Sequence, residues 1–169
     1  MKLEMNEIGT SYQNPLKIYI IEDDFAVRKS SQILCEQMNL PCFTFGSGEE
    51  LFEHLKHDPL PVGCAIVDIK LYGMSGLGVL NLINAHYPGI VPVLLTAFGE
   101  LKQVADVMND RNVRVIPKPY VGDAFWDAIV ESLSIASRKL NKEPDSRCFI
   151  ECANSIAPAK PSKSINRFR

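Results

Sequence analysis

Short apolar runs alternate along the chain with longer amphipathic segments. Five short runs rich in Val, Ile, Leu or aromatic residues predict β-strands over Lys17–Ile21, Cys42–Phe45, Cys64–Val67, Val91–Leu95 and Val113–Ile116. The segments between them carry apolar residues spaced as on one side of a helix. They predict helices over Phe25–Met38, Gly48–Leu55, Gly76–Tyr87 and Val121–Leu133, and a weaker, shorter helix over Glu100–Met108.

Apolar strands joined by helical connections are typical of a parallel sheet covered on both faces. We therefore predict a doubly wound five-stranded α/β domain over residues 16–139. In such sheets, ligands and reactive groups lie beyond the carboxyl ends of the strands, where the winding changes direction.

The two ends of the chain lack this pattern. Residues 1–15 predict a flexible N-terminal extension. Residues 140–169 contain three prolines and many small polar residues, which predicts a disordered tail. Six basic and three acidic side chains make this tail mildly basic.

The composition is that of a globular protein: 169 residues, 46% apolar, with a formal charge of −2. This balance gives no strong electrostatic preference for nucleic acid or membrane. No apolar run reaches the roughly 18–20 residues that span a bilayer, and the first residues include acids without an apolar signal-peptide core. We predict a cytoplasmic protein that has no membrane contact.

Five cysteines, an odd number with irregular spacing, argue against a disulfide framework. Cys35, Cys42 and Cys64 lie in apolar segments and are expected to be core thiols. Cys148 and Cys152 form a C-x3-C pair without a second pair to complete a zinc site. Ordinary thiols are favoured there over a metal or redox role.

Polar residues follow four of the predicted strands. Glu22 and Asp23 follow the first strand, Asp68 the third, Thr96 the fourth and Lys118 the fifth. Three carboxylates brought together favour a hard cation such as Mg²⁺. A carboxylate held there can accept a phosphoryl group, with a lysine and a hydroxyl to stabilise the phosphoryl oxygens.

Each residue also has a simpler interpretation when taken alone. Asp23 or Asp24 could cap the following helix, Asp68 could start a turn, Thr96 could be a strand residue and Lys118 a surface charge. The joint placement on one edge of the sheet favours a site. Asp24, directly before the helical segment, is the better candidate for the cap.

Four stretches carry a family resemblance: IYIIEDDFAVRKS, VDIKLYGMSG, LLTAFG and IPKPY. In order and spacing they resemble the receiver domain of two-component response regulators. Within that family, the FixJ-like receivers are most similar, especially in AVRKS and IKLYGMSG. The resemblance implies a flavodoxin-like fold with strand order 2-1-3-4-5.

The resemblance also implies a chemistry. Asp68 would accept a phosphoryl group from a sensor histidine kinase or phosphotransfer protein, assisted by Thr96 and Lys118, and the bond before Pro119 would be cis. The chain would catalyse only its own phosphorylation and slow dephosphorylation. The implied Mg²⁺ ligands are Glu22, Asp23, Asp68 and the backbone carbonyl of Lys70.

The output implied by the family uses the face formed by the fourth helix, the fifth strand and the last helix. That face would bind a downstream protein, or a second copy of the chain after phosphorylation. Val115 stands where relatives have an aromatic switch residue, and Asp110, Arg111 and Asn112 stand where many have Ala-Gly-Ala. Glu22 replaces the commoner Asp.

Three alternatives remain open. The chain could be a FixJ-type transcriptional regulator that has lost its helix-turn-helix domain; the residues after Asn141 show no pair of amphipathic helices, so nucleic-acid binding is not expected. An aspartyl phosphatase would carry a second Asp two residues after the nucleophile, where this chain has Lys70. An inactive docking receiver would not need Asp68, Thr96 and Lys118.

Overall fold

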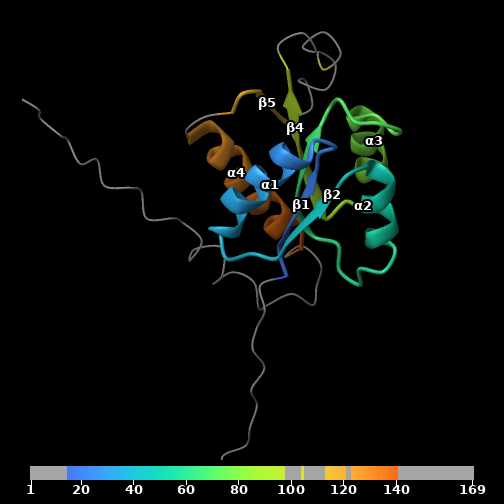
Figure 1. Cartoon of the computed structure of the whole chain (residues 1–169). Coiled ribbons are helices and arrows are strands. Elements are labelled where there is room, and N and C mark those ends of the chain that lie inside the picture. The colour runs from blue at the N-terminus through green and yellow to red at the C-terminus, as the bar shows by residue number, and fades with distance from the viewer. Residues whose placement is uncertain (1–14, 98–103, 105–112, 121–122, 141–169) are drawn as a thin grey trace, which may run out of the picture.

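The computed structural model describes residues 15–97, 104, 113–120 and 123–140. Five parallel strands form one sheet in the order β2-β1-β3-β4-β5 (Figure 1). Their bounds are Lys17–Ile21 (β1), Cys42–Phe45 (β2), Gly63–Asp68 (β3), Ile90–Thr96 (β4) and Arg114–Pro117 (β5). The predicted doubly wound, flavodoxin-like sheet is confirmed. The winding changes direction between β1 and β3, so the carboxyl ends of these two strands lie at the switch point.

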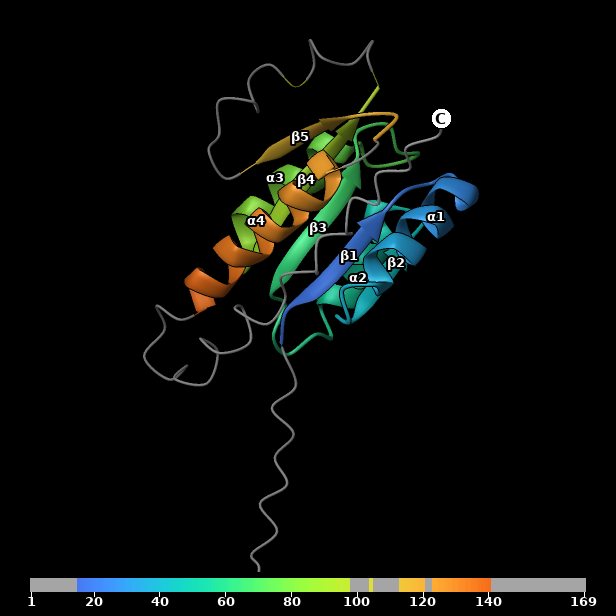
Figure 2. The same cartoon turned by 90° about the vertical axis from the view of Figure 1, so that its left-hand side faces the viewer.

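Helices cover both faces of the sheet. Two of them, α1 (Phe25–Glu36) and α4 (Asp123–Leu140), lie on one face, while α2 (Gly48–Leu55) and α3 (Gly76–His86) lie on the other (Figures 1 and 2). Each face has its own buried apolar cluster. No helix in the described part of the chain has the length and apolarity needed to cross a bilayer.

The apolar run in β1 divides between the two faces. Ile18 and Ile20 belong to the cluster under α1 and α4. Tyr19 and Ile21 belong to the cluster under α2 and α3. All four side chains are fully buried, because successive residues of a strand point to opposite faces and both faces are covered here.

Three helices end away from their predicted positions, and for α3 the difference is one residue, His86 instead of Tyr87. The first helix ends at Glu36 instead of Met38, because the chain turns through Asn39, whose φ is 53°. The last helix is described from Asp123, because its predicted start at Val121 lies outside the described residues, and it continues to Leu140 instead of Leu133. Its buried stripe continues through small residues, Ala136 and Ser137, which give a weak apolar signal in the sequence.

The predicted bounds of β1, β2 and α2 agree with the structure, and those of β3, β4 and β5 differ by one residue at each end. The predicted helix over Glu100–Met108 lies outside the described residues, apart from the buried Val104. The predicted extension and tail, Asp110 to Asn112, and Cys148 with Cys152 also lie outside the described residues.

Three cysteines lie in the cluster beneath α1 and α4, as predicted for core thiols. Cys35 and Cys64 are fully buried and Cys42 is half-buried. Burial raises the pKa of the Cys64 thiol to about 12. That thiol therefore stays protonated and unreactive near neutral pH.

Candidate functional site: an acidic cluster at the switch point

The three acids after β1 have different surroundings. The carboxylate of Asp24 accepts hydrogen bonds from the backbone N–H groups of Ala26 at 2.8 Å and Val27 at 3.0 Å, so Asp24 is the N-cap of α1, as predicted. Glu22 is only 2% exposed, and its backbone N–H extends the pairing with β2 by donating to the Phe45 carbonyl. The capping role therefore belongs to Asp24, which leaves Glu22 and Asp23 for another purpose.

Asp68 is the last residue of β3 and is 6% exposed. Its Oδ1 accepts a hydrogen bond of 3.3 Å from the backbone N–H of Lys70. The N-terminus of α3 packs directly behind it, where the backbone N–H of Gly76 donates to the Ile69 carbonyl at 3.0 Å. Strand, turn and helix thus fix the position of this carboxylate at the sheet edge.

Glu22, Asp23 and Asp68 come together at the switch point. One carboxylate oxygen from each lies within 4.8 Å of the other two, and no other such group occurs among the described residues. Carboxylates so close repel one another unless a cation is present. An all-oxygen donor set, partly buried and partly open to water, fits Mg²⁺.

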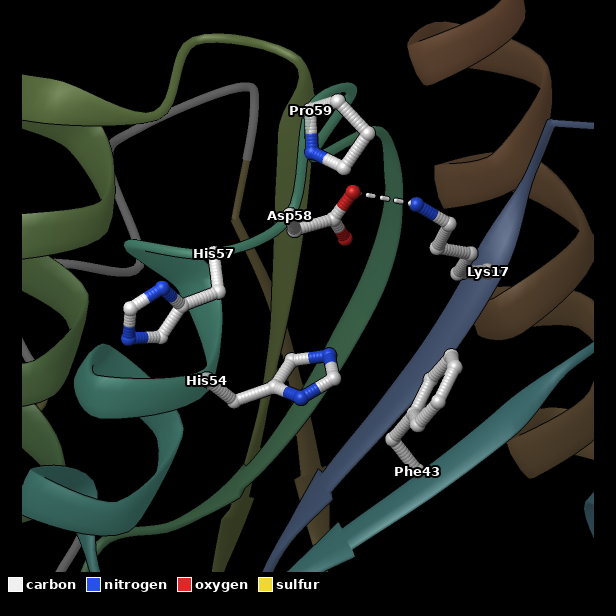
Figure 3. Close-up of a pocket in the computed structure, with 6 residues that line it drawn as sticks. All are labelled: Lys17, Phe43, His54, His57, Asp58 and Pro59. Carbon is white, nitrogen blue, oxygen red and sulfur yellow. Dashed lines mark hydrogen bonds and ion pairs between the residues drawn. The ribbon is translucent and has the colours of Figure 1, made fainter.

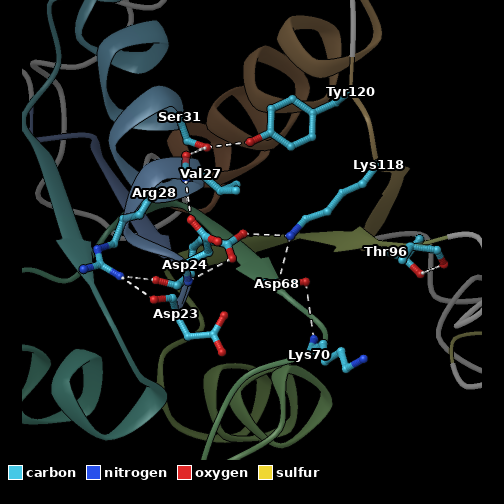
Figure 4. Close-up of polar contacts among 12 residues, drawn as sticks. Asp23, Asp24, Val27, Arg28, Ser31, Asp68, Lys70, Thr96, Lys118 and Tyr120 are labelled. Carbon is cyan, nitrogen blue, oxygen red and sulfur yellow. Dashed lines mark hydrogen bonds and ion pairs between the residues drawn. The ribbon is translucent and has the colours of Figure 1, made fainter.

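Lys118 follows β5 and reaches into this cluster. Its Nζ lies 2.8 Å from Glu22 Oε2 and 2.9 Å from Asp68 Oδ2 (Figure 4). The Lys118–Pro119 bond is cis, as predicted. Lys118 is therefore a cation supplied by the chain itself, shared between the first and third strand ends.

Burial and charge change the proton affinities of this pair. Burial raises the pKa of the Glu22 carboxyl, and the Asp68 charge raises it further, against the opposing effect of the Lys118 hydrogen bond. Burial lowers the pKa of Lys118, but its contacts with Glu22 and Asp68 outweigh that effect and leave the pKa above the usual value. Lys118 thus stays charged at neutral pH.

Thr96 ends β4 and is fully buried. Its Oγ1 donates a hydrogen bond of 3.0 Å to the carbonyl of Ala97, and Figure 4 shows this hydroxyl directed away from Asp68. The structure therefore brings Glu22, Asp23, Asp68 and Lys118 into contact distance. Thr96 lies on the same edge of the sheet, but its hydroxyl points away from these residues.

The sequence reasoning gave no role to two features beside the cluster. Arg28 Nη1 donates to the backbone carbonyls of Glu22 at 2.5 Å and Asp23 at 3.3 Å. The hydroxyl of Tyr120, two residues beyond Lys118, lies 2.6 Å from Ser31 Oγ on α1. Arg28 lies one helical turn after the cap, and Tyr120 ends the IPKPY stretch, so both residues belong to stretches that carry the family resemblance. Their partners emerge only from the fold.

Residues 18–130 match the family model of the response regulator receiver domain. Nodulation protein W of Bradyrhizobium diazoefficiens is 28% identical over 116 residues, which cover 67% of this chain and 49% of that protein. Transcriptional regulatory protein FixJ of Azorhizobium caulinodans is 27% identical over 132 residues, covering 78% of this chain and 61% of FixJ. This chain thus spans about half to two thirds of the length of these relatives.

The fold agrees with solved structures. The response regulator StyR superposes with a TM-score of 0.66 at 26% identity, covering 75% of this chain and 63% of StyR. A receiver domain protein from Clostridium thermocellum gives a TM-score of 0.63 at 22% identity, covering 75% of this chain and 98% of that structure. The family match covers β2 to β5 completely, all of β1 except Lys17, and the first part of α4. The chain belongs to the response regulator receiver domain family of two-component signalling systems.

Proposed function

We propose that this chain is a phosphoacceptor switch: Asp68 receives a phosphoryl group from a sensor histidine kinase or phosphotransfer protein, and the change at that site alters the surface of the domain. The contact between Asp68 and Lys118 at 2.9 Å, inside a cluster with Glu22 and Asp23, is the observation that carries the proposal. This contact places the positive charge of Lys118 beside the carboxylate that would act as the nucleophile.

In this reaction an Asp68 carboxylate oxygen attacks phosphorus. The P–N bond of a phosphohistidine breaks, a P–O bond to Asp68 forms, and the released imidazole retains the electron pair of the broken bond. Lys118 already contacts Asp68 Oδ2 and so lies beside the incoming phosphoryl oxygens, whose charge it stabilises. Glu22, Asp23, Asp68 and the Lys70 carbonyl would hold Mg²⁺, which supplies further positive charge for those oxygens.

Phosphorylation changes the charge at Asp68 and therefore the hydrogen bonds that neighbouring residues form. The phosphoryl group carries about −1.5 to −2 charges, which favours a rotation of the Thr96 hydroxyl from Ala97 toward the phosphoryl oxygens. Because Thr96 ends β4 and pairs with Pro117 of β5, that rotation acts on the β5–α4 side of the domain. We propose this side as the docking face for a downstream protein or a second phosphorylated copy. Half-buried Val115 in β5 replaces the aromatic switch residue of relatives.

The remaining assignments are proposals that rest on the sequence. The receiver domain would comprise residues 16–139, flanked by an extension over residues 1–15 and a mildly basic tail over residues 140–169. The protein would act in the cytoplasm, and its only catalysis would be its own phosphorylation and slow dephosphorylation. Receiver domains are signalling modules, which agrees with this limited catalytic role.

A second candidate function is transcriptional regulation. The names of FixJ and of DctD from Rhizobium meliloti describe transcriptional regulatory proteins, and this chain matches a part of each. If this chain bound DNA by itself, its affinity would fall steeply with salt because counterions are released on binding. A fluorescence polarisation titration at two salt concentrations tests this candidate, and we expect no salt-dependent binding.

Intact mass measurement after incubation with acetyl phosphate and Mg²⁺ tests the main proposal. The wild type should gain the mass of one phosphoryl group, only when Mg²⁺ is present, and Asp68→Asn should gain none. Asp127→Asn changes an exposed carboxylate on α4 and should behave as wild type. Equal labelling of wild type and Asp68→Asn would exclude Asp68 as the acceptor.

A further inference from the structure

Tyr120 connects the segment after β5 to α1. Its hydroxyl lies 2.6 Å from Ser31 Oγ (Figure 4). Its ring stacks on Phe125, with ring centroids 4.6 Å apart and planes inclined by 14°. Ser31 is 1% exposed. A part-buried hydroxyl pair at this short distance, with one ring held by stacking, is a fixed contact between two elements distant in sequence.

The direction of the hydrogen bond between Tyr120 and Ser31 follows from the number of hydroxyl hydrogens available. Ser31 Oγ also lies 2.9 Å from the backbone carbonyl of Val27, which can only accept a hydrogen bond. The single hydroxyl hydrogen of Ser31 therefore goes to Val27. Tyr120 must then be the donor to Ser31, and the phenol hydrogen is committed to α1.

The bridge closes a ring of polar contacts that passes through Glu22 and Lys118. From Val27, the backbone N–H donates to Asp24 Oδ1 at 3.0 Å. The backbone N–H of Asp24 lies 3.4 Å from Glu22 Oε1, and the other carboxylate oxygen of Glu22 accepts from Lys118 Nζ at 2.8 Å. Two residues of chain lead from Lys118 to Tyr120 and complete the ring. Glu22 and Lys118 are therefore held relative to each other from both sides, and Lys118 also contacts Asp68.

Lys118 needs such support because its ammonium ends a flexible stem of four methylene groups. On the strand side, the backbone N–H of Lys118 donates to the Thr96 carbonyl at 2.7 Å. On the other side, Tyr120 provides the next anchor to a neighbouring element. With both anchors the Lys118 backbone is fixed at a position from which the ammonium reaches Glu22 and Asp68, and its contacts with these two carboxylates then hold it there.

We propose that Tyr120 and Ser31 are positioning residues for Lys118: their hydrogen bond ties the segment after β5 to α1 and holds the ammonium over Asp68 for phosphoryl transfer. The rate effect of this bridge rests on the proposed function above, whereas its effect on the position of Lys118 does not. Neither residue touches the phosphoryl donor, and both act through Lys118.

The test uses Tyr120→Phe, Ser31→Ala and the double variant. Tyr120→Phe keeps the ring that stacks on Phe125, and Ser31→Ala leaves that stack untouched. Ser30→Ala is a matched control, since Ser30 makes the same helical contact, 2.8 Å to the Ala26 carbonyl, but is exposed. Tyr87→Phe is the control for loss of a phenol hydroxyl, because Tyr87 stacks on Phe52 of α2.

Two measurements separate positioning from general stability. The first is the ¹⁵N NMR signal of the Lys118 ammonium, recorded without phosphodonor. It should shift in Tyr120→Phe and in Ser31→Ala but not in the controls. The second is the phosphorylation rate at varied acetyl phosphate. Loss of one neutral hydrogen bond should lower the maximal rate about three- to tenfold and leave the half-saturating concentration unchanged.

The double variant should be no slower than the slower single variant, because both substitutions remove the same bond. Multiplying effects, or an unmoved Lys118 signal in both single variants, would overturn the proposal. If the wild type accepts no phosphoryl group while the Lys118 signal still moves in Tyr120→Phe, the proposed function fails and the positioning of Lys118 stands.

Discussion

Lys118 Nζ lies 2.8 Å from Glu22 Oε2, so the acidic cluster already contains a positive charge from the chain itself. The same ammonium contacts Asp68 at 2.9 Å. A divalent cation that approaches Glu22, Asp23 and Asp68 therefore meets acids whose charge is partly compensated.

The first prediction concerns Mg²⁺ affinity. Replacing Lys118 by Met removes the internal cation while keeping an unbranched side chain. Mg²⁺ should then bind roughly three- to tenfold more tightly, because the repulsion between the two cations is lost. Isothermal titration calorimetry without phosphodonor measures this directly.

Lys56→Met is the matched control, because Lys56 is exposed and pairs with Glu53 on the surface. It should leave the Mg²⁺ affinity unchanged. Weaker Mg²⁺ binding by Lys118→Met would mean that the lysine organises the acids more than it competes for them.

The second prediction concerns the Thr96 hydroxyl, which now donates to Ala97. If that hydroxyl rotates to the phosphoryl group, Thr96→Ala loses one donor to a developing charge and should accept phosphate about tenfold more slowly. Thr96→Ser keeps the donor and should recover most of the rate. Stopped-flow kinetics with acetyl phosphate provide the comparison, and a serine variant as slow as the alanine variant would contradict the assigned role.

The third prediction concerns the support behind Asp68. A Cβ atom on Gly76 would lie 2.1 Å from the Asp68 carbonyl oxygen and 2.6 Å from Ile69 Cα. Both are backbone atoms, so Gly76→Ala must displace the end of β3 or the start of α3. We expect a loss of about 2 kcal/mol or more in the free energy of unfolding, together with slower phosphorylation.

Gly78 provides the control for this substitution. A Cβ there would meet the flexible side chain of Met74 at 3.1 Å, with no backbone atom among its close neighbours. Gly78→Ala should therefore change the free energy of unfolding by less than about 1 kcal/mol. Urea denaturation of both variants checks the pair, and equal losses would refute the argument from the Asp68 backbone.

Apolar patterning predicted the sheet well because the strands are short, continuous and buried on both faces. The rule that reactive groups gather beyond strand carboxyl ends then brought Glu22, Asp68 and Lys118 to one edge. The errors fell where the signal is weak. Small buried residues such as Ala136 continue α4 without a clear apolar stripe, and the turn after α1 begins before the pattern ends.

The polar contacts of the site depended on the fold. The pairing of Tyr120 with Ser31 joins two residues far apart in sequence, and neither residue alone indicates this contact. The direction of the Thr96 hydroxyl depends on a side-chain rotation, which residue spacing does not encode. Only the separate capping role of Asp24 followed from local rules, because a cap is defined by adjacent backbone.

The fourth prediction concerns the opposite end of the sheet, where Asp58 lies against the start of β1. Its Oδ1 is 2.5 Å from Lys17 Nζ and its Oδ2 accepts from the Tyr19 hydroxyl at 2.9 Å (Figure 3 shows the Lys17 contact). The Asp58 side chain is 4% exposed. Burial raises the pKa of Asp58, but hydrogen bonds from Lys17, the Leu60 backbone and Tyr19 outweigh burial and hold that pKa below its usual value.

A carboxyl whose pKa is lower in the folded state stabilises the fold at pH values above its unfolded pKa, about 3.9. That stability is lost as the pH falls below this value and through the folded pKa. Asp58→Asn should therefore cost about 1.5–3 kcal/mol near neutral pH, the range for hydrogen bonds to charged groups, and clearly less near pH 3. Urea denaturation of both proteins at the two pH values measures the difference. An equal cost at acid and neutral pH would show that the charge of Asp58 does not contribute.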